Sequence, residues 1–266
     1  MSPRRIAAAA AAVALSVLAS VAAAQEAREM KGDGWSAAIA PVSGFTGEMT
    51  MTMESETPQD MAVTEAIRFE PWQMLDELFR NDIVFVMRAG PSDWDAPDDP
   101  EAGPMDCTGQ RPLSNRGDDA MRQLGTLLVV NELRPGRILV SERCAAQQTY
   151  AALERGMLNL DMNALDGMTA DLDPRLTRLG TRNGGDGASL REVVMDWDGG
   201  EGEGPLLVIT HFDNVEAMTN FRIYEGEMLM VDPKRDGRVL GYLRLASATP
   251  DPLRYPADVV ERSMAE

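Results

Sequence analysis

The sequence predicts an α/β protein, a three-layer sandwich with a mostly parallel central sheet flanked by helices. Short apolar runs at 83–87, 137–141 and 206–210 have the length and composition of strands that are buried on both faces. Segments with apolar residues at helical spacing alternate with these runs, which indicates a layered α/β fold. With 266 residues, 44% of them hydrophobic, the chain is long enough for one full-sized domain with a substantial core.

The N-terminus has the pattern of a secretory signal peptide. Arg4 and Arg5 precede an apolar, alanine-rich run at 6–21, and small residues at 22–24 form a cleavage site before Gln25. A membrane anchor is the less favoured alternative, because the apolar run is shorter than the roughly 20 residues of a spanning helix. We therefore expect a periplasmic or secreted protein that has no membrane contact after cleavage.

Changes in composition, and the positions of glycine and proline, divide the remaining chain into three parts. Residues 25–70 are polar and rich in glycine and proline, so we expect an N-terminal extension with one or two short strands. The main domain is expected at 71–248, followed by a C-terminal tail at 249–266.

Within the domain, residues at helical spacing predict helices at 71–79, 114–133, 143–156 and 215–221. Ser114 suits the N-cap of the second of these helices, and Gly156 suits the end of the third. The acidic, glycine-rich stretch at 158–204 hints at a single helix around residues 190–197. Two further strands, near 227–232 and 238–245, close the domain.

Composition excludes several classes of function. A net charge of −18, which becomes −20 after loss of the two signal-peptide arginines, argues against a nucleic-acid partner. A single histidine excludes sites with two or three histidine ligands, and two cysteines exclude a zinc ribbon, so we expect no cofactor. In an oxidising compartment Cys107 and Cys144 form either a disulfide or two buried free thiols, and the sequence does not choose between them.

Two charged residues lie where strands end. Arg88 and His211 come directly after the apolar runs at 83–87 and 206–210. Ligands of open α/β sheets bind beyond the carboxyl ends of the parallel strands, so both residues are candidates for a binding site.

Four segments in order carry a resemblance to a known family. The family is the histidine phosphatase superfamily, the phosphoglycerate-mutase-like group. Residues 83–90 resemble its strand with an Arg-His-Gly signature, and residues 106–117 resemble the helix start that follows. Residues 138–149 resemble its next strand with an Arg-Ala-x-x-Thr helix start, and residues 207–215 resemble the strand that carries its second histidine. The likeness spans residues 70–245. It implies the three-layer fold and a phosphoryl-transfer pocket.

The resemblance implies roles that this chain fills only in part. In the family the first histidine is the phosphoryl-accepting nucleophile, and two arginines with the second histidine hold the phosphate oxygens. Arg88 and His211 match those positions, with His211 expected to be protonated. Ala89 stands at the nucleophile position, and Ala145 stands where the second arginine is expected.

Some roles are left open by the residues around these positions. Arg143 lies two residues before Ala145 and is a candidate for partial replacement of the missing arginine. In some branches an Asp follows the second histidine, but here the residue is Phe212, and neither Asp213 nor Asp166 can be assigned as a general acid.

These departures predict a pseudoenzyme that retains part of a phosphate or anion pocket. Its partner would be a small phosphorylated or anionic ligand, or a protein. One alternative is an active phosphomonoesterase with a non-standard mechanism that uses His211 or an activated water. A second is a periplasmic copper-binding protein, because Met49, Met51 and Met53 offer soft thioether ligands at alternate positions. A third is a calcium site among the carboxylates at 196–204.

Overall fold

The computed structural model describes residues 30–32, 35–39, 48–55, 63–69, 75–99, 102–177, 187–200 and 204–252, with only the backbone described before residue 63. The predicted signal peptide at 1–24 and the end of the tail beyond 252 lie outside these residues. No helix in the described part of the chain combines the length and apolar character needed to cross a membrane.

The described strands form one mixed sheet in the order β1-β2-β3-β4-β10-β9-β5-β8-β6-β7. The strands are β1 (Met30–Gly32), β2 (Trp35–Ile39), β3 (Glu48–Ser55), β4 (Ala66–Phe69), β5 (Val84–Arg88), β6 (Arg137–Val140), β7 (Thr169–Leu172), β8 (Leu206–Thr210), β9 (Met228–Asp232) and β10 (Arg238–Leu245). The helices are α2 (Leu75–Leu78), α3 (Asn115–Val130), α4 (Cys144–Leu160), α5 (Ala188–Met195) and α6 (Phe212–Thr219).

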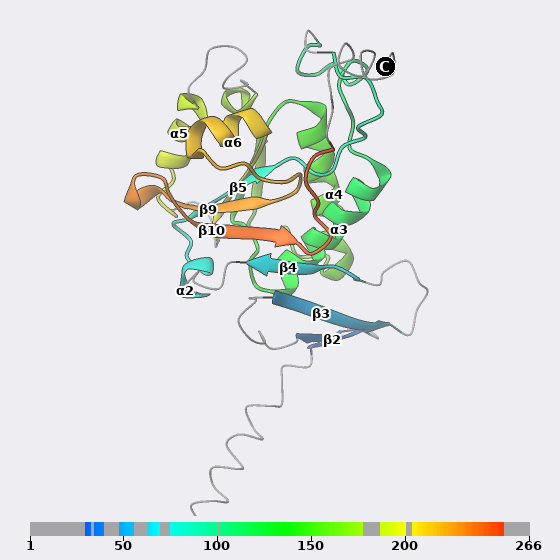
Figure 1. Ribbon diagram of the computed structural model, residues 1–266. Coiled ribbons are helices and arrows are strands. Elements are labelled where there is room, and N and C mark those ends of the chain that lie inside the picture. The colour runs from blue at the N-terminus through cyan, green and yellow to red at the C-terminus, as the bar shows by residue number, and fades with distance from the viewer. Residues whose placement is uncertain are drawn as a thin grey trace, which may run out of the picture.

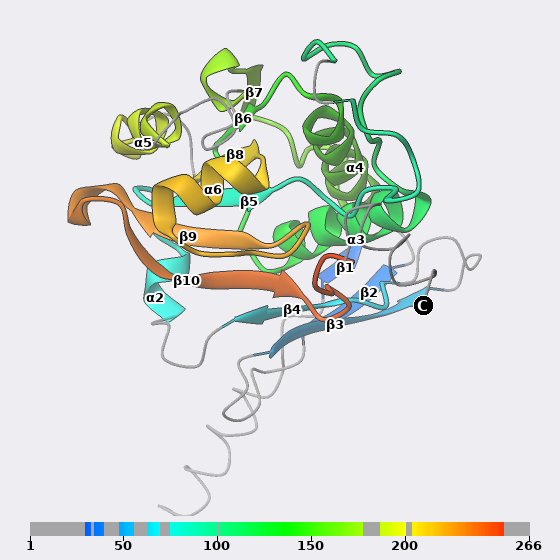
Figure 2. The ribbon, with the colours of Figure 1, turned by 45° about the horizontal axis from the view of Figure 1, so that its top comes forward.

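Helices cover both faces of this sheet, which confirms the α/β class and its layers. Figures 1 and 2 show α3 and α4 on one face and α5 and α6 on the other. Along β5, Phe85 and Met87 pack into the core beneath α3 and α4, whereas Val84 and Val86 pack into the core beneath α5 and α6. Because alternate residues of a strand point to opposite faces, a strand buried on both sides reads as the continuous apolar run seen in the sequence.

The expectation of a mostly parallel sheet is wrong. Only β5, β8, β6 and β7 pair in parallel, and β9, β10 and the strands at the N-terminus pair antiparallel. β9 and β10 are joined by the short turn at 233–237, and a connection of that length permits only an antiparallel pair. The N-terminal region also contributes four strands instead of the expected one or two.

Other boundaries differ for physical reasons. Helix α4 continues past Gly156, because this glycine lets α4 lie against α3: a Cβ there would meet the carbonyl oxygen of Arg122 at 1.8 Å. Gly125 on α3 makes the equivalent close contact with the carbonyl of Leu153 on α4.

The expected helix at 71–79 is described only as the single turn α2. Strand β7 was not expected, because its residues are exposed and their hydrophobicity does not alternate as in a typical strand. Ser114 is confirmed as the N-cap of α3, since its side chain accepts a hydrogen bond from the amide of Gly117.

Candidate functional site

A cavity of about 400 Å³ opens at the carboxyl edge of the parallel strands. Arg88 ends β5, His211 follows β8, and Arg143 precedes α4, which follows β6. The start of β9 and the end of β10 reach the same edge, because β9 runs antiparallel to β5 and β10 runs antiparallel to β9. The lining residues are Arg88, Ala89, Gly90, Ser92, Trp94, Asp98, Gln110, Arg111, Arg143, Ala145, His211, Phe212, Asp213, Glu225 and Asp251.

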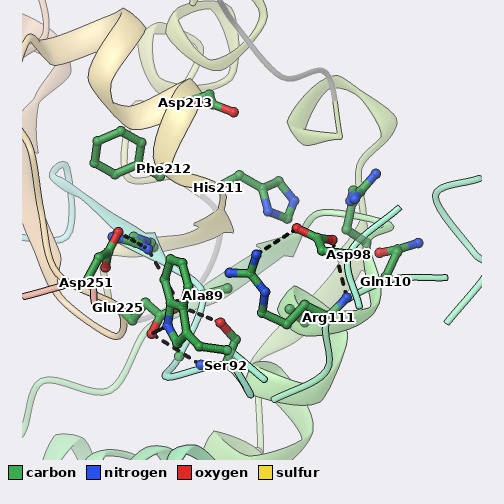
Figure 3. Close-up of a pocket in the computed structure, with 15 residues that line it drawn as sticks. Ala89, Ser92, Asp98, Gln110, Arg111, His211, Phe212, Asp213, Glu225 and Asp251 are labelled. Carbon is green, nitrogen blue, oxygen red and sulfur yellow. Dashed lines mark hydrogen bonds and ion pairs between the residues drawn. The ribbon is translucent and has the colours of Figure 1, made fainter. Parts of the chain in front are cut away.

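Arg88 is held by carboxylates of its own chain. Its Nη2 donates to Oδ2 of Asp251 at 2.9 Å, while Nη1 lies 2.9 Å from Oδ1 of the same carboxylate. Nη1 also donates to the carbonyl of Ile223 at 2.9 Å, and Oε1 of Glu225 lies 3.6 Å from Nη2. The ring of Phe212 lies 5.0 Å from the guanidinium, so this residue contributes a cation–π contact instead of an acid. Figure 3 shows Asp251 and Glu225 on one side of the cavity, with His211, Asp98 and Arg111 on the other.

Ala89 and Ala145 both line the cavity. Ala89 is buried, and its amide donates to the carbonyl of Thr210 at 2.9 Å. The amide of Gly90 donates to Oγ1 of Thr149 at 2.9 Å, and that hydroxyl in turn donates to the carbonyl of Ala145 at 2.7 Å. These backbone groups are therefore already hydrogen-bonded, and neither alanine side chain supplies a lone pair or a charge.

His211 shares the cavity with Arg88, as the pattern of strand ends predicts. Its Nε2 lies 2.8 Å from Oγ of Ser141, a fully buried hydroxyl at the end of β6. Burial lowers the pKa of His211 to about 3, with further lowering by the positive charges of Arg143 and Arg88. The ring is therefore neutral at physiological pH, which differs from the protonated histidine that we expected from the sequence.

The other two arginines of the cavity differ in their partners. Arg111 donates to Oδ2 of Asp98 at 3.1 Å and lies 4.1 Å from the ring of Trp94. The Arg143 guanidinium makes no hydrogen bond or ion pair with any residue that the structure describes. The positive charge of Arg143 also acts on His211 and contributes to its lowered pKa.

Glu225, which no sequence pattern pointed to, organises the opposite wall. Its carboxylate accepts from the hydroxyl of Ser92 at 2.5 Å and from Nε1 of Trp94 at 3.0 Å. Glu225 lies just before β9, which starts at this edge of the sheet because it runs antiparallel to β5. Knowing the direction of β9 was therefore the only way to place Glu225 at the site from the sequence. Asp251 was missed because it falls in the expected tail at 249–266.

The cavity as a whole is not strongly positive. Its lining contains three arginines (Arg88, Arg111 and Arg143) and four carboxylates (Asp98, Asp213, Glu225 and Asp251). With His211 neutral, the lining sums to about one negative charge. A multiply charged anion therefore meets a locally positive region only near Arg143.

A disulfide joins Cys107 and Cys144, with their Cα atoms 5.5 Å apart. It ties the loop before α3 to the first residue of α4, next to Arg143. In the same loop Gln110 accepts a hydrogen bond from the amide of Cys144 at 3.1 Å and donates to the carbonyls of Gly103 and Pro104. The disulfide and this cap together fix the start of α4 at the cavity.

Several candidates lie elsewhere. The turn that contains Asp166 does not reach the cavity. Backbone pairing places Met49, Met51 and Met53 on one face of β3, and their side chains lie outside the described residues. Among the residues that are described, no group of three or more His, Cys, Asp or Glu side chains is positioned to hold a metal ion.

Comparison with solved structures gives partial likenesses in fold. A protein assigned as the phosphohistidine phosphatase SixA of Agrobacterium tumefaciens is 16% identical, with 65% of this chain and 100% of that chain covered and a TM-score of 0.40. The protein histidine phosphatase SixA complexed with tungstate is 20% identical, with 59% and 93% covered and a TM-score of 0.38. The phosphoglycerate mutase of Plasmodium falciparum is 16% identical, with 66% and 96% covered and a TM-score of 0.37.

No family model matches the chain, and no curated protein matches it. The likeness to solved structures is one of fold and assigns no role to any residue. The roles argued below follow from the geometry of this chain and from its sequence motifs.

Proposed function

We propose that this protein is a secreted, non-catalytic binding protein on a histidine-phosphatase-like fold, which holds an anionic group in the cavity beside Arg143 and His211. The observation that carries the proposal is Ala89. This residue lines the cavity next to Arg88, and it stands at the sequence position where the motif resemblance expects a phosphoryl-accepting histidine.

Alanine cannot form a covalent phosphoryl intermediate, because its methyl side chain has no lone pair. Loss of the nucleophile in a covalent mechanism reduces rates by about 10³–10⁶. Ala145 removes a charged group as well, and such a group contributes roughly 10²–10³ when it stabilises a transition state. The chain contains no second histidine that could substitute for the missing one.

Binding chemistry is nevertheless present. Arg143 offers a cation that is free of partners within the described chain, and the neutral ring of His211, held by the buried hydroxyl of Ser141, lines the same cavity. Charge-assisted hydrogen bonds to a guanidinium are the strong contacts in anion sites. The cavity volume of about 400 Å³ is that of a small-molecule pocket.

An assay with a generic aryl phosphomonoester tests the absence of catalysis. We expect no turnover above buffer for the wild-type protein and measurable turnover for the double variant A89H/A145R, which restores both missing groups. Wild-type turnover that is abolished by His211→Ala would contradict the proposal and favour a phosphomonoesterase that uses His211.

Calorimetric titration with inorganic phosphate and with acetate tests the binding half. We expect saturable binding of at least one of these anions, weakened by Arg143→Gln. Arg155→Gln provides a matched control, because this exposed arginine lies outside the cavity and pairs with Asp118.

A further inference from the structure

The cavity is partly closed by a segment of the chain's own C-terminal region. Figure 1 shows the chain in red where it turns upward beyond the end of β10. Within residues 247–252, Asp251 lines the main cavity, while Pro250 and Pro252 line a second cavity of about 200 Å³. The two cavities share Ser92, Trp94 and Glu225 in their walls, and the 247–252 segment borders both of them.

We propose that Asp251 is an internal ligand of Arg88, and that the site binds an extended peptide bearing a carboxylate, which displaces the 247–252 segment and takes the place of Asp251. This inference rests on the proposed binding function and adds to it a position for a peptide carboxylate at Arg88, in the same cavity as Arg143 and His211. It assigns Arg88, which the chain itself keeps occupied, to carboxylate recognition.

The way the segment is attached supports its displacement. Its first residues are fixed, since the amide of Ser247 donates to the Glu65 carboxylate at 3.3 Å and the amide of Ala248 donates to the carbonyl of Leu245 at 3.1 Å. Among the described residues, 249–252 make no hydrogen bond other than that between Asp251 and Arg88. Among the described hydrogen bonds, the Asp251 side chain is therefore what ties residues 249–252 to the site.

Exposure follows the same division. Thr249, Pro250 and Pro252 are exposed, and only Asp251 turns into the cavity. The proline after Asp251 biases that residue toward an extended backbone, and proline has no amide hydrogen to pair with a neighbouring strand. The segment is thus an extended chain that presents one carboxylate, which is the shape of the ligand we propose.

The geometry at Arg88 fits a carboxylate. Both guanidinium nitrogens Nη1 and Nη2 lie 2.9 Å from the two oxygens of Asp251, in the side-by-side arrangement that planar carboxylates make with arginine. Oδ1 of Asp251 is nevertheless buried without a well-directed hydrogen bond. A carboxylate on a free chain can improve this contact, because it is not constrained by the anchored residues 247 and 248.

The surrounding charge disfavours a phosphate dianion at the same place. Oε1 of Glu225 lies 3.6 Å from Nη2 of Arg88, and that carboxylate is fixed by Ser92 and Trp94. A second negative charge on the ligand would face Glu225 without a further cation, whereas a single negative charge only replaces that of Asp251.

The test compares full-length wild-type protein with the variant Asp251→Asn. Each is titrated by calorimetry with the peptide acetyl-Thr-Pro-Asp-Pro-amide, with its Asn counterpart and with inorganic phosphate. We expect Asp251→Asn to bind the Asp peptide about 10-fold more tightly than wild type does, because the internal competitor has been removed. The Asn peptide should bind neither protein, and phosphate should bind the variant more weakly than the Asp peptide does.

Asp213→Asn is the charge-matched control, since it removes a carboxylate from the same cavity that has no contact with Arg88. We expect its affinity for the Asp peptide to stay within about twofold of the wild-type value. An equal gain in both variants would show a general charge effect and overturn the proposal, as would a preference of Asp251→Asn for phosphate. Arg88→Gln in the Asp251→Asn background should abolish peptide binding, with folding verified by thermal unfolding.

The outcomes separate this inference from the proposed function. If wild type binds phosphate or acetate and Asp251→Asn gains no affinity for the peptide, the inference fails and the binding function stands. If neither protein binds any of the probes, both fail.

Discussion

Two arginines face the same cavity and differ in almost every other respect. Arg88 ends a central strand, its side chain is only 9% exposed, and it contacts Asp251, Glu225 and the carbonyl of Ile223. Arg143 stands at the start of α4, and its guanidinium has no partner in the described chain. The first is occupied by the protein and contributes to the fold, whereas the second is available. A matching motif residue is therefore not the same thing as a free binding group.

The largest expected effect on stability comes from the disulfide that fixes the start of α4, next to Arg143. Replacing both members of the Cys107–Cys144 disulfide by serine releases a loop of 37 residues, and we expect the free energy of unfolding to fall by about 3–4 kcal/mol. Urea unfolding with and without reductant measures this loss. Reductant should destabilise wild type and leave the serine variant unchanged, and an equal effect on both would contradict the prediction.

Arg88 should show the next largest effect. Arg88→Gln leaves the carboxylates of Asp251 and Glu225 without their cation, so we expect a loss of about 2–4 kcal/mol in urea unfolding. Adding Asp251→Asn should recover part of this loss, since it removes one of the stranded charges. A double-mutant cycle gives the coupling energy, and a coupling near zero would show that the ion pair does not contribute to stability.

The sequence predicted much of the fold because burial leaves a local signature. The runs at 83–87 and 206–210 became β5 and β8, and the positions of Arg88 and His211 at strand ends brought both into one cavity. The antiparallel half of the sheet was missed because the direction of a strand depends on its partner, which periodicity does not encode. The shortness of the turn at 233–237 was the one feature of the sequence that indicated an antiparallel pair.

The carboxylates that pair with Arg88 could not be predicted from local sequence patterns, for a related reason. Glu225 and Asp251 lie 137 and 163 residues from Arg88 along the chain, and no spacing rule connects positions so far apart. Gly156 shows the same limit in a helix, where a residue typical of helix ends serves a contact with α3. Long-range contacts decided which charges are free.

His211 lies under the influence of both arginines and should make stability depend on pH. Its pKa is about 3 in the folded protein and near 6.5 in the unfolded chain, so only the unfolded state takes up the proton as the pH falls through this range. We expect stability to decrease by about 1–2 kcal/mol between pH 6.5 and pH 5, where most carboxylates stay ionised.

Urea unfolding at these two pH values measures the change. His211→Gln, which retains a hydrogen-bonding group toward Ser141, should flatten this dependence, while Asp213→Asn should retain it. If the glutamine variant shows the wild-type slope, another group is responsible.

Arg143 should give the smallest effect on stability and the most direct view of the site's field. We expect Arg143→Gln to change the free energy of unfolding by less than about 0.5 kcal/mol, since no described partner loses a contact. Of the two arginines, Arg143 lowers the pKa of His211 more, so its substitution should raise the pKa of the ring from about 3. An NMR titration of the single histidine reads this shift without interference from other imidazoles. A large loss of stability together with an unchanged titration would mean that Arg143, like Arg88, is a structural residue.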